Sequence, residues 1–216
     1  MRPFLLVLSS PSGGGKSTIA RRLLESHEGL AYSISATTRA ARAGERDGQH
    51  YHFLTAEEFQ RRQQRGDFLE SAEFGGHLYG TLRSEVERVL GSGKVALLDI
   101  EVEGARQLRR QVPDAVFVFI MPPSAEVLVQ RLTGRGTDGP EAVARRIHRA
   151  AEELKAAREY DYVVVNDDLD RAVAQVAAIL AAESVRGNRL DQSLSERVER
   201  LWRDVEAAAE RLTSRT

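Results

Sequence analysis

The chain has 216 residues, of which 42% are hydrophobic, and a formal net charge of −1. This size allows a sizeable buried core, so we expect one globular domain, and the balanced charge gives no general attraction to nucleic acid or to a membrane surface. The absence of cysteine excludes disulfides, thiol catalysis and cysteine-ligated zinc. It fits a reducing compartment, and since no targeting or membrane-spanning segment is recognisable we expect a cytoplasmic protein.

The first element that the sequence predicts is a strand at Phe4–Leu8. It leads into the loop SSPSGGGKST (residues 9–18), and the apolar spacing that follows predicts a helix over Ser17–Ser26. A strand, a glycine-rich loop and a helix in this order indicate a phosphate-binding loop, although the usual pattern has a glycine where Ser10 stands. The alternative interpretation is an ordinary glycine-rich turn.

The loop also has suitable chemistry. Glycines at positions 13–15 lack the Cβ atoms that would keep successive backbone N–H groups from turning inward around an anion. Lys16 adds a mobile positive charge, and the hydroxyl of Ser17 can ligate Mg²⁺.

Along the rest of the chain, apolar and partly β-branched runs alternate with segments of helical spacing, which is typical of a parallel α/β sheet. The predicted strands are Phe4–Leu8, Tyr51–Leu54, Val95–Ile100, Val116–Ile120 and Tyr162–Val165. The predicted helices are Ser17–Ser26, Ala56–Arg65, Leu82–Leu90, Glu103–Arg110, Ala125–Leu132, Glu141–Arg158 and Leu169–Glu183.

Two segments interrupt this alternation. Short strand-like pieces and polar turns predict an inserted subdomain over about 33–82, and the glycine- and arginine-rich segment TGRGTDGP predicts a mobile lid over about 133–156. The expected division is therefore a core of 1–32, 83–132 and 157–185, these two insertions, and a C-terminal helical extension, 186–216.

Within the expected subdomain, Arg39 and Arg42 lie in a polar loop and Tyr51 lies on the next strand. Arginine holds phosphate oxygens through two parallel donors, and a tyrosine hydroxyl can complete the shell. These residues suit a bound phosphate group, and a solvated charged loop is the alternative.

Asp99 ends a predicted strand at the edge of the sheet where the phosphate loop lies, so its carboxylate can orient waters around Mg²⁺. The alternative is a structural carboxylate.

Several arginines flank or follow the expected lid and suit a phosphate clamp. They are Arg131, Arg135, Arg145, Arg146 and Arg149. The last three share one helix, where only some can point inward, so we favour Arg135 and Arg146. The alternative is a solvated helix face that pairs with nearby glutamates.

The extension carries a regular apolar seam. Its residues, at alternating spacings of four and three, are Leu194, Val198, Leu201, Val205, Ala208 and Leu212. Fewer than three heptads are marginal for an independent coiled coil, so we expect this helix to dock against the domain in preference to self-association.

Six segments resemble, in order, the motifs of the guanylate kinase family: SSPSGGGKST, ATTRAARAGERDGQHY, FLESAEFGGHLYGT, LLDIEVEG, LTGRGTD and VVVNDDLD. The resemblance extends from about Phe4 to Glu183. Six motifs in order identify a family far more specifically than a glycine loop alone, which unrelated nucleotide hydrolases share. The resemblance implies an α/β P-loop nucleoside monophosphate kinase fold and transfer of the γ-phosphoryl group of ATP to GMP, and we expect dGMP as well, with Mg²⁺. ATP and GMP are the expected partners.

The resemblance also implies roles for individual residues. The implied ATP-binding residues are Ser12, Gly13, Gly14, Gly15, Lys16, Ser17, Thr18, Arg131, Asn166 and Asp167. The implied GMP-binding residues are Ser35, Arg39, Arg42, Tyr51, Glu70, Tyr79, Thr81 and Glu101. The implied catalytic residues are Lys16, Arg39, Arg135 and Arg146, and Ser17 and Asp99 would hold Mg²⁺, partly through water.

Physical chemistry favours Glu70 as the guanine reader. Guanine presents two adjacent donors, N1–H and the 2-amino group, which an ionised carboxylate accepts together, whereas adenine presents a bare acceptor at N1 and should be rejected. Hydroxyls at Ser35 and Thr81 can donate to guanine O6. The alternative for Glu70 is an exposed carboxylate, and the role of Glu101 is open because the family commonly has aspartate there, as it has glutamine at Glu103.

Two other functions fit parts of the pattern. A scaffolding module can keep this fold as a peptide-binding domain, but such modules lose the phosphate loop that this chain retains. A kinase of another small phosphate acceptor would not need a guanine reader at Glu70.

Overall fold

The computed structural model describes residues 2–134, 140–189 and 192–213. Its main sheet has five strands in the order β2-β7-β1-β8-β9, and every neighbouring pair is parallel. The strands are β1 (Leu5–Ser9), β2 (Leu30–Tyr32), β7 (Val95–Asp99), β8 (Val116–Met121) and β9 (Tyr162–Val165).

Helices cover both faces of this sheet, as a parallel sheet with continuous apolar strands requires. One face packs against α1 (Lys16–Ser26) and α7 (Leu169–Ser184), the other against α3 (Arg83–Gly91) and α4 (Val102–Gln111). All five residues of β1 are buried. The strand that leads into the glycine loop therefore lies at the centre of the core.

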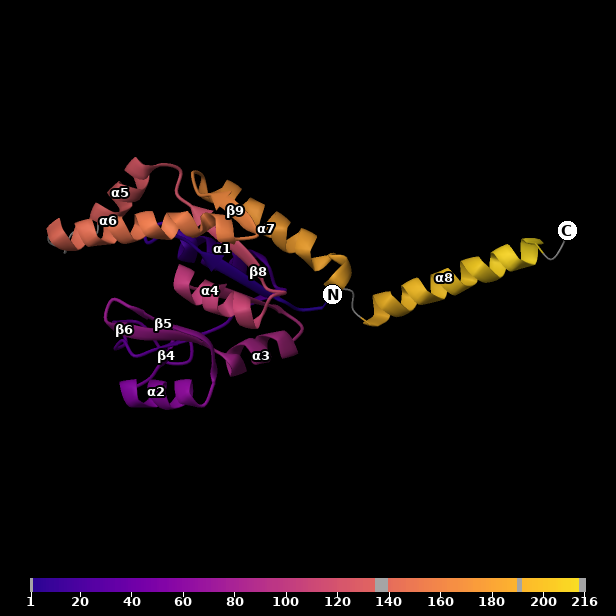
Figure 1. Cartoon of the computed structure of the whole chain (residues 1–216), viewed down its shortest axis with the longest axis horizontal. Coiled ribbons are helices and arrows are strands. Elements are labelled where there is room, and N and C mark those ends of the chain that lie inside the picture. Colours follow the sequence, from indigo (N-terminus) through magenta and orange to yellow (C-terminus); the bar gives the residue numbers. More distant parts are fainter. Residues whose placement is uncertain (1, 135–139, 190–191, 214–216) are drawn as a thin grey trace.

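A second, four-stranded sheet has the order β4-β3-β6-β5 and lies below the main sheet in Figure 1. Its elements are β3 (Ser35–Thr37), β4 (His52–Phe53), β5 (Phe68–Phe74), β6 (His77–Leu82) and the covering helix α2 (Ala56–Gln64). The stacked rings of Phe59 and Phe68, with centroids 4.4 Å apart, belong to its own small core.

Two strand predictions need correction. The run Tyr51–Leu54 was expected in the parallel sheet, but its residues His52–Phe53 form β4 of the second sheet. The main sheet instead has an edge strand at Leu30–Tyr32 that was not predicted. Strands of two and three residues are too short to show a hydrophobic period, so their pairing depends on tertiary contacts.

The carboxyl end of the main sheet brings three loops together. Leu8 of β1 is paired with Asp99 of β7, so the glycine loop begins beside that carboxylate. Asn166 directly follows β9 and its backbone N–H bonds the carbonyl of Met121 at the end of β8. Ligands of open α/β sheets bind at this edge.

The remaining helices follow the main sheet along the chain. They are α5 (Ala125–Thr133), α6 (Pro140–Lys155), the short turns η1 (Ala156–Glu159) and η2 (Gly187–Arg189), and α8 (Gln192–Thr213). Within the described residues, no helix is long and apolar enough to cross a membrane.

The expected docking of the extension against the domain is wrong. Helix α8 extends away from the body (Figure 1), and Val198, Leu201 and Val205 are 53%, 63% and 61% exposed. The physical reason is that the helices on both faces of the main sheet already close its core, which leaves no sheet face for α8 to cover.

Candidate functional site

The glycine loop closes tightly over the start of α1. Gly15 has a φ of 93°, in the left-handed region, and a Cβ added there would lie 2.3 Å from Nδ2 of Asn166. That Nδ2 atom donates to the carbonyl of Gly14 at 2.9 Å, and Arg131 reaches the same carbonyl at 3.4 Å. Only glycine fits this close approach. The hydrogen bonds from Asn166, which follows β9, and from Arg131 of α5 hold the loop in place.

Lys16 lies between two carboxylates. It forms an ion pair with Asp99, and its Nζ donates to Oε1 of Glu101 at 3.3 Å. Burial alone would lower the pKa of Lys16, but the two neighbouring negative charges outweigh it and raise the pKa. The side chain is therefore a fixed cation at the carboxyl edge of the sheet.

The residues beside Lys16 fit a magnesium ion. Glu101 Oε2 is buried and has no hydrogen-bond partner among the described residues, which leaves an anionic oxygen for a cation. Among those residues no three His, Cys, Asp or Glu side chains form a cage of their own. Mg²⁺ needs none, since it commonly takes one or two carboxylates together with substrate phosphates and water.

A first cavity of about 830 Å³ surrounds the glycine loop. It is lined by every residue for which the sequence implied ATP binding: Ser12, Gly13, Gly14, Gly15, Lys16, Ser17, Thr18, Arg131, Asn166 and Asp167. Backbone N–H groups at a helix N-terminus and two cationic side chains, Lys16 and Arg131, suit it to a polyphosphate.

A second cavity of about 470 Å³ adjoins the first and is lined by residues of both sheets. The two cavities share Lys16, Ser17, Phe74 and Glu101. Of the residues implied for GMP, Ser35, Tyr51, Glu70, Tyr79 and Glu101 line the second cavity. A ligand in each cavity would thus meet the other beside Lys16.

Glu70 is a buried carboxylate that the small sheet contributes to the second cavity. Its side chain is 6% exposed and accepts a hydrogen bond of 2.7 Å from the hydroxyl of Thr81, the residue paired with it across β5 and β6. Burial raises the pKa of Glu70 to about 7, against the opposing effect of the Thr81 hydrogen bonds. The alternative of an exposed carboxylate is thereby excluded.

Gly104 makes room for this carboxylate. A Cβ at that position would lie 2.4 Å from Glu70 Oε2, so α4 approaches the carboxylate as closely as a side-chain-free residue allows. Sequence reasoning missed this role. The available signal was the glycine inside a predicted helix, which is unfavourable unless close packing requires it.

Arg39 does not line the second cavity, and neither do Arg42 and Thr81, but it lies against Tyr51, which does. Its Nη2 donates to Glu45 at 2.8 Å, and its guanidinium lies 5.4 Å from the ring centre of Tyr51. Glu45 also accepts the backbone N–H of Arg42 at 2.7 Å. Hydrogen bonds from Arg39 and then from the Arg42 backbone lower the pKa of Glu45 to about 2. In the sequence, Glu45 is one residue of the polar turn GERDG (residues 44–48), and nothing local indicates its contact with Arg39.

One lid arginine that the sequence did not favour contributes to the site. Arg149, not Arg146, lines the second cavity; its guanidinium lies 4.2 Å from the ring centre of Phe74, and its Nε bonds Glu153. Glu153 in turn accepts the backbone N–H of Ser12 at 2.9 Å, so α6 contacts the glycine loop directly. Neither contact has a signal in local sequence.

The other predicted clamp residues stay predictions. Arg135 lies outside the described residues. Arg145 is exposed and lies 3.8 Å from Glu141, its neighbour on the same helix face.

A phosphate-binding loop at the carboxyl edge of a parallel sheet, joined to a second cavity under a separate small sheet, defines a P-loop nucleoside monophosphate kinase fold. The sequence profile described as guanylate kinase matches residues 2–183. The chain belongs to the guanylate kinase family.

Individual relatives support the same family assignment. The chain is 51% identical to the guanylate kinase of Symbiobacterium thermophilum, with 89% of this chain and 91% of the relative covered. It is 51% identical to that of Chelativorans sp., with 87% of each covered. A crystal structure of guanylate kinase from Anaplasma phagocytophilum superposes with a TM-score of 0.74 at 36% identity, covering 89% of this chain and 92% of that one.

Proposed function

We propose that the first cavity binds ATP and the second binds GMP, and that the γ-phosphoryl group of ATP passes to GMP beside Lys16 to give ADP and GDP. The observation that carries this assignment is the pair of adjoining cavities that share Lys16, Ser17 and Glu101. The small molecules ATP and GMP are its proposed partners, and the lack of cysteine supports a reducing compartment such as the cytoplasm.

On the donor side, the backbone N–H groups of the glycine loop would hold the phosphates while Lys16 neutralises their charge. Asn166 and Asp167 line the same cavity, and we assign them to the adenine. Arg131, which already contacts the Gly14 carbonyl, adds a positive charge at the outer side.

A magnesium ion would be held by Ser17 and Asp99, partly through water, and Glu101 has a free oxygen within the same group. The ion supplies charge neutralisation on the phosphates when bound. Lys16 shares the two carboxylates, so its position is set before any nucleotide arrives.

On the acceptor side, ionised Glu70 would accept guanine N1–H and the 2-amino group, and the hydroxyl of Ser35, which lines the same cavity, would donate to O6. The hydroxyl of Thr81, expected from the sequence to donate to O6, already donates to Glu70 and would instead hold that carboxylate in place. Tyr51 and Tyr79 line the same cavity, and with Arg39 and Arg42 they would bind the GMP phosphate. Because the carboxylate is buried, an unmatched base would leave it with Thr81 as its partner and without the two donors of guanine, which is a heavy cost.

The transfer itself needs little covalent help, since rate comes from alignment and from charge placed where it develops on the transferring group. We assign this to Lys16, Arg39, Arg135 and Arg146. The subdomain 33–82 and the lid 133–156 would close over both nucleotides, so that GMP rather than water accepts the phosphoryl group.

Formation of ADP from MgATP with GMP, AMP, CMP or UMP as acceptor tests this function. We expect turnover with GMP to exceed that with AMP by about a hundredfold or more. Equal turnover of AMP and GMP would overturn the role of Glu70, and no turnover with any acceptor would favour a binding module.

A further inference from the structure

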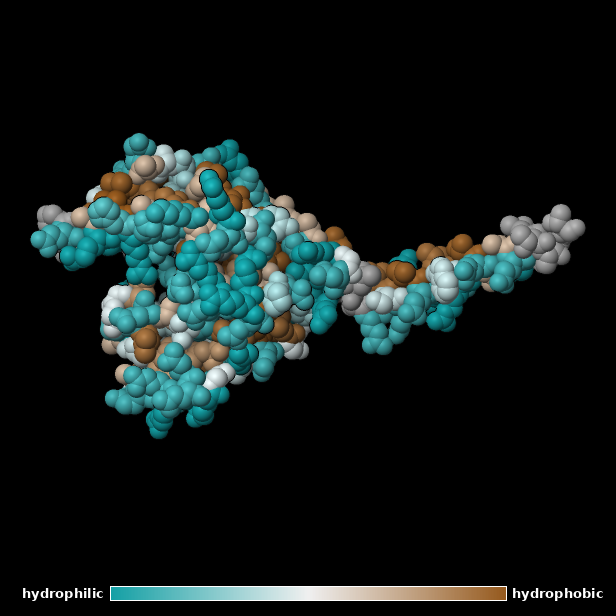
Figure 2. Space-filling view, viewed as in Figure 1, coloured by the Kyte–Doolittle hydropathy of each residue, from teal (hydrophilic) through white to brown (hydrophobic). Residues whose placement is uncertain are grey.

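Helix α8 carries a solvent-exposed apolar stripe. It has 22 residues, and its hydrophobic side chains gather along one side while hydrophilic ones cover the other (Figure 2). Leu194, Val198, Leu201, Trp202 and Val205 of this stripe are between 41% and 63% exposed. An isolated helix is marginal in water, so a stripe of this size needs a partner surface.

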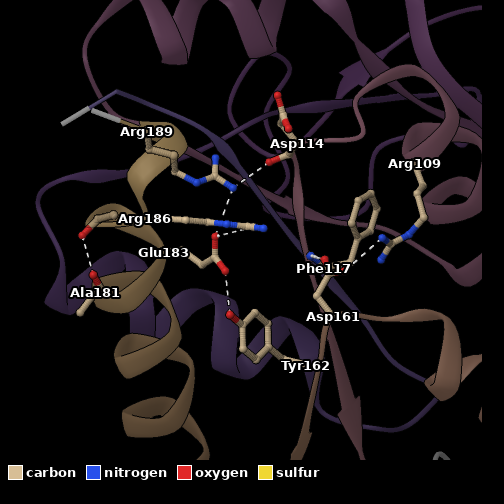
Figure 3. Close-up of polar contacts among 10 residues, drawn as sticks. Arg109, Asp114, Phe117, Asp161, Tyr162, Ala181, Glu183, Arg186 and Arg189 are labelled. Carbon is tan, nitrogen blue, oxygen red and sulfur yellow. Dashed lines mark hydrogen bonds and ion pairs between the residues drawn. The ribbon is translucent and has the colours of Figure 1, made fainter. Parts of the chain in front are cut away.

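The segment that precedes α8 is anchored far from the nucleotide site. At the end of α7, Glu183 accepts hydrogen bonds from Tyr162 at 2.7 Å and from Arg189 at 3.2 Å, and Arg189 also donates to the carbonyl of Asp114 (Figure 3). These contacts fix the departure point at the amino edge of the main sheet. The cavities lie at the carboxyl edge, so a partner on α8 leaves them open.

We propose that α8 binds the α8 of a second copy of this chain in an antiparallel coiled coil. The seam residues then form layers in which Val198 faces Leu201 of the second copy and Leu194 faces Val205 of the second copy. By symmetry each pairing occurs twice. The helices overlap from Gln192 to Ala207, about 24 Å at 1.5 Å per residue.

Charge complementarity selects this register. The residues that flank the seam on one side are Arg197 and Asp204, and in the proposed register each Arg197 lies opposite Asp204 of the second copy. Both side chains are exposed. The dimer would therefore have two ion pairs, each between an arginine of one copy and an aspartate of the other.

The competing arrangements lack this match. Shifting the antiparallel register by one heptad places Arg197 opposite Arg211 and Asp204 opposite the second Asp204, which is repulsive. A parallel pair places these two residues beside Trp202 and Ala209, so no ion pair forms. Flanking charges that attract in one arrangement and repel in another are the usual means by which helices choose orientation.

The outer face argues against a membrane as the occupant. Its charges include the pair Arg203–Glu199 at 3.3 Å, and acidic residues such as Glu196 and Glu206 alternate with basic ones along the helix. A helix that binds anionic lipid has an excess of lysine and arginine on this face.

Charge reversal tests the pairing in the full-length chain. Asp204→Arg puts two like-charged pairs at the interface and should raise the dimer dissociation constant about tenfold or more. The double variant Arg197→Asp with Asp204→Arg restores opposite charges and should restore the dimer. Glu206→Arg, the same charge change on the outer face, is the matched control. Sedimentation velocity across a dilution series gives the dissociation constants, and GMP phosphorylation should be equal in all variants.

A monomeric wild-type chain at every concentration would overturn the proposal, as would an Asp204→Arg dimer as tight as wild type. Because the chain has no cysteine, disulfide trapping reports the orientation independently. Mixing Val198→Cys with Leu201→Cys should give a cross-linked heterodimer under mild oxidation, with little cross-linking of either variant alone. Cross-linking of each variant with itself would establish a parallel pair and contradict the antiparallel one.

Discussion

The two cavities hold their charged groups in opposite ways. In the first, the central cation is Lys16, whose positive form is reinforced by two carboxylates, and Arg131 and the backbone N–H groups of the glycine loop add to it. Among the charged residues that line the second, Glu70 is a buried carboxylate whose pKa is raised to about 7 and which accepts a hydrogen bond from the hydroxyl of Thr81. The first arrangement suits any polyphosphate, whereas the second suits a base with two adjacent donors. Changes in the first should therefore alter rate, and changes in the second should alter which nucleotide enters.

The largest expected effect is that of Lys16→Ala. Removing the cation between the donor and acceptor cavities should lower kcat about a thousandfold, because it acts on charge that develops during transfer. GMP affinity, measured by binding titration without ATP, should change little. Lys94→Ala, at an exposed turn far from the loop, is the control. Unchanged kcat in Lys16→Ala would remove the glycine loop from the reaction.

Glu70→Gln tests the other side of the comparison. An amide cannot accept both guanine donors, so the KM for GMP should rise about a hundredfold while the KM for ATP is maintained. Glu87→Gln, an exposed residue of α3, provides the matched control. Steady-state kinetics with each substrate varied in turn separates the two constants. A rise confined to the KM for ATP would mean that the cavities have been assigned the wrong way round.

The same contrast shows what the sequence could predict. The glycine loop is a local motif, and all ten residues implied for ATP from Ser12 to Asp167 line one cavity. Asp99 could also be placed, since it ends a strand of strong apolar period. Such features can be predicted because all the residues that define them lie within a short stretch of sequence.

The contacts that the sequence did not predict join residues that are far apart along the chain. The closeness of Gly104 to Glu70 joins α4 to β5, and the contact of Glu153 with Ser12 joins residues 141 positions apart. The prediction that α8 docks against the domain failed for a similar reason. A periodic apolar seam shows that a helix needs a partner surface, but it does not show whether the domain has a free surface to offer. The edge strand β2 has three residues and no period to detect.

Gly104→Ala should act through Glu70 alone. The added methyl group overlaps Oε2 and must displace a carboxylate that Thr81 also holds, so we expect the KM for GMP to rise ten- to thirtyfold, roughly, with a smaller change in kcat. Gly91→Ala is the control, since a Cβ there meets no atom within 4 Å. Thermal unfolding should show both variants folded. Equal kinetics of the two alanine variants would contradict the close approach of α4.

The raised pKa of Glu70 predicts a pH dependence. Below about pH 7 the carboxyl of the free enzyme is protonated and cannot accept both guanine donors, so kcat/KM for GMP should rise with pH and level off above 7. Between pH 8 and pH 6 we expect a fall of about tenfold. Ionisation of the GMP phosphate near pH 6 also contributes to the pH dependence of kcat/KM, and it does so in every variant. Glu70→Gln should retain only that contribution, and an identical pH profile in both proteins would exclude Glu70.

The smallest expected effect distinguishes two roles for Glu45. If this carboxylate positions Arg39 for the GMP phosphate, Glu45→Gln should raise the KM for GMP about threefold and leave kcat nearly unchanged, since the amide keeps only one of two acceptor oxygens. If it instead competes with the phosphate for the guanidinium, the same change should lower the KM. We expect the rise, because Glu45 also binds the backbone of Arg42 and so shapes the loop that carries both arginines. A lowered KM would make Glu45 a competitor and would show that Arg39 is released from it whenever GMP binds.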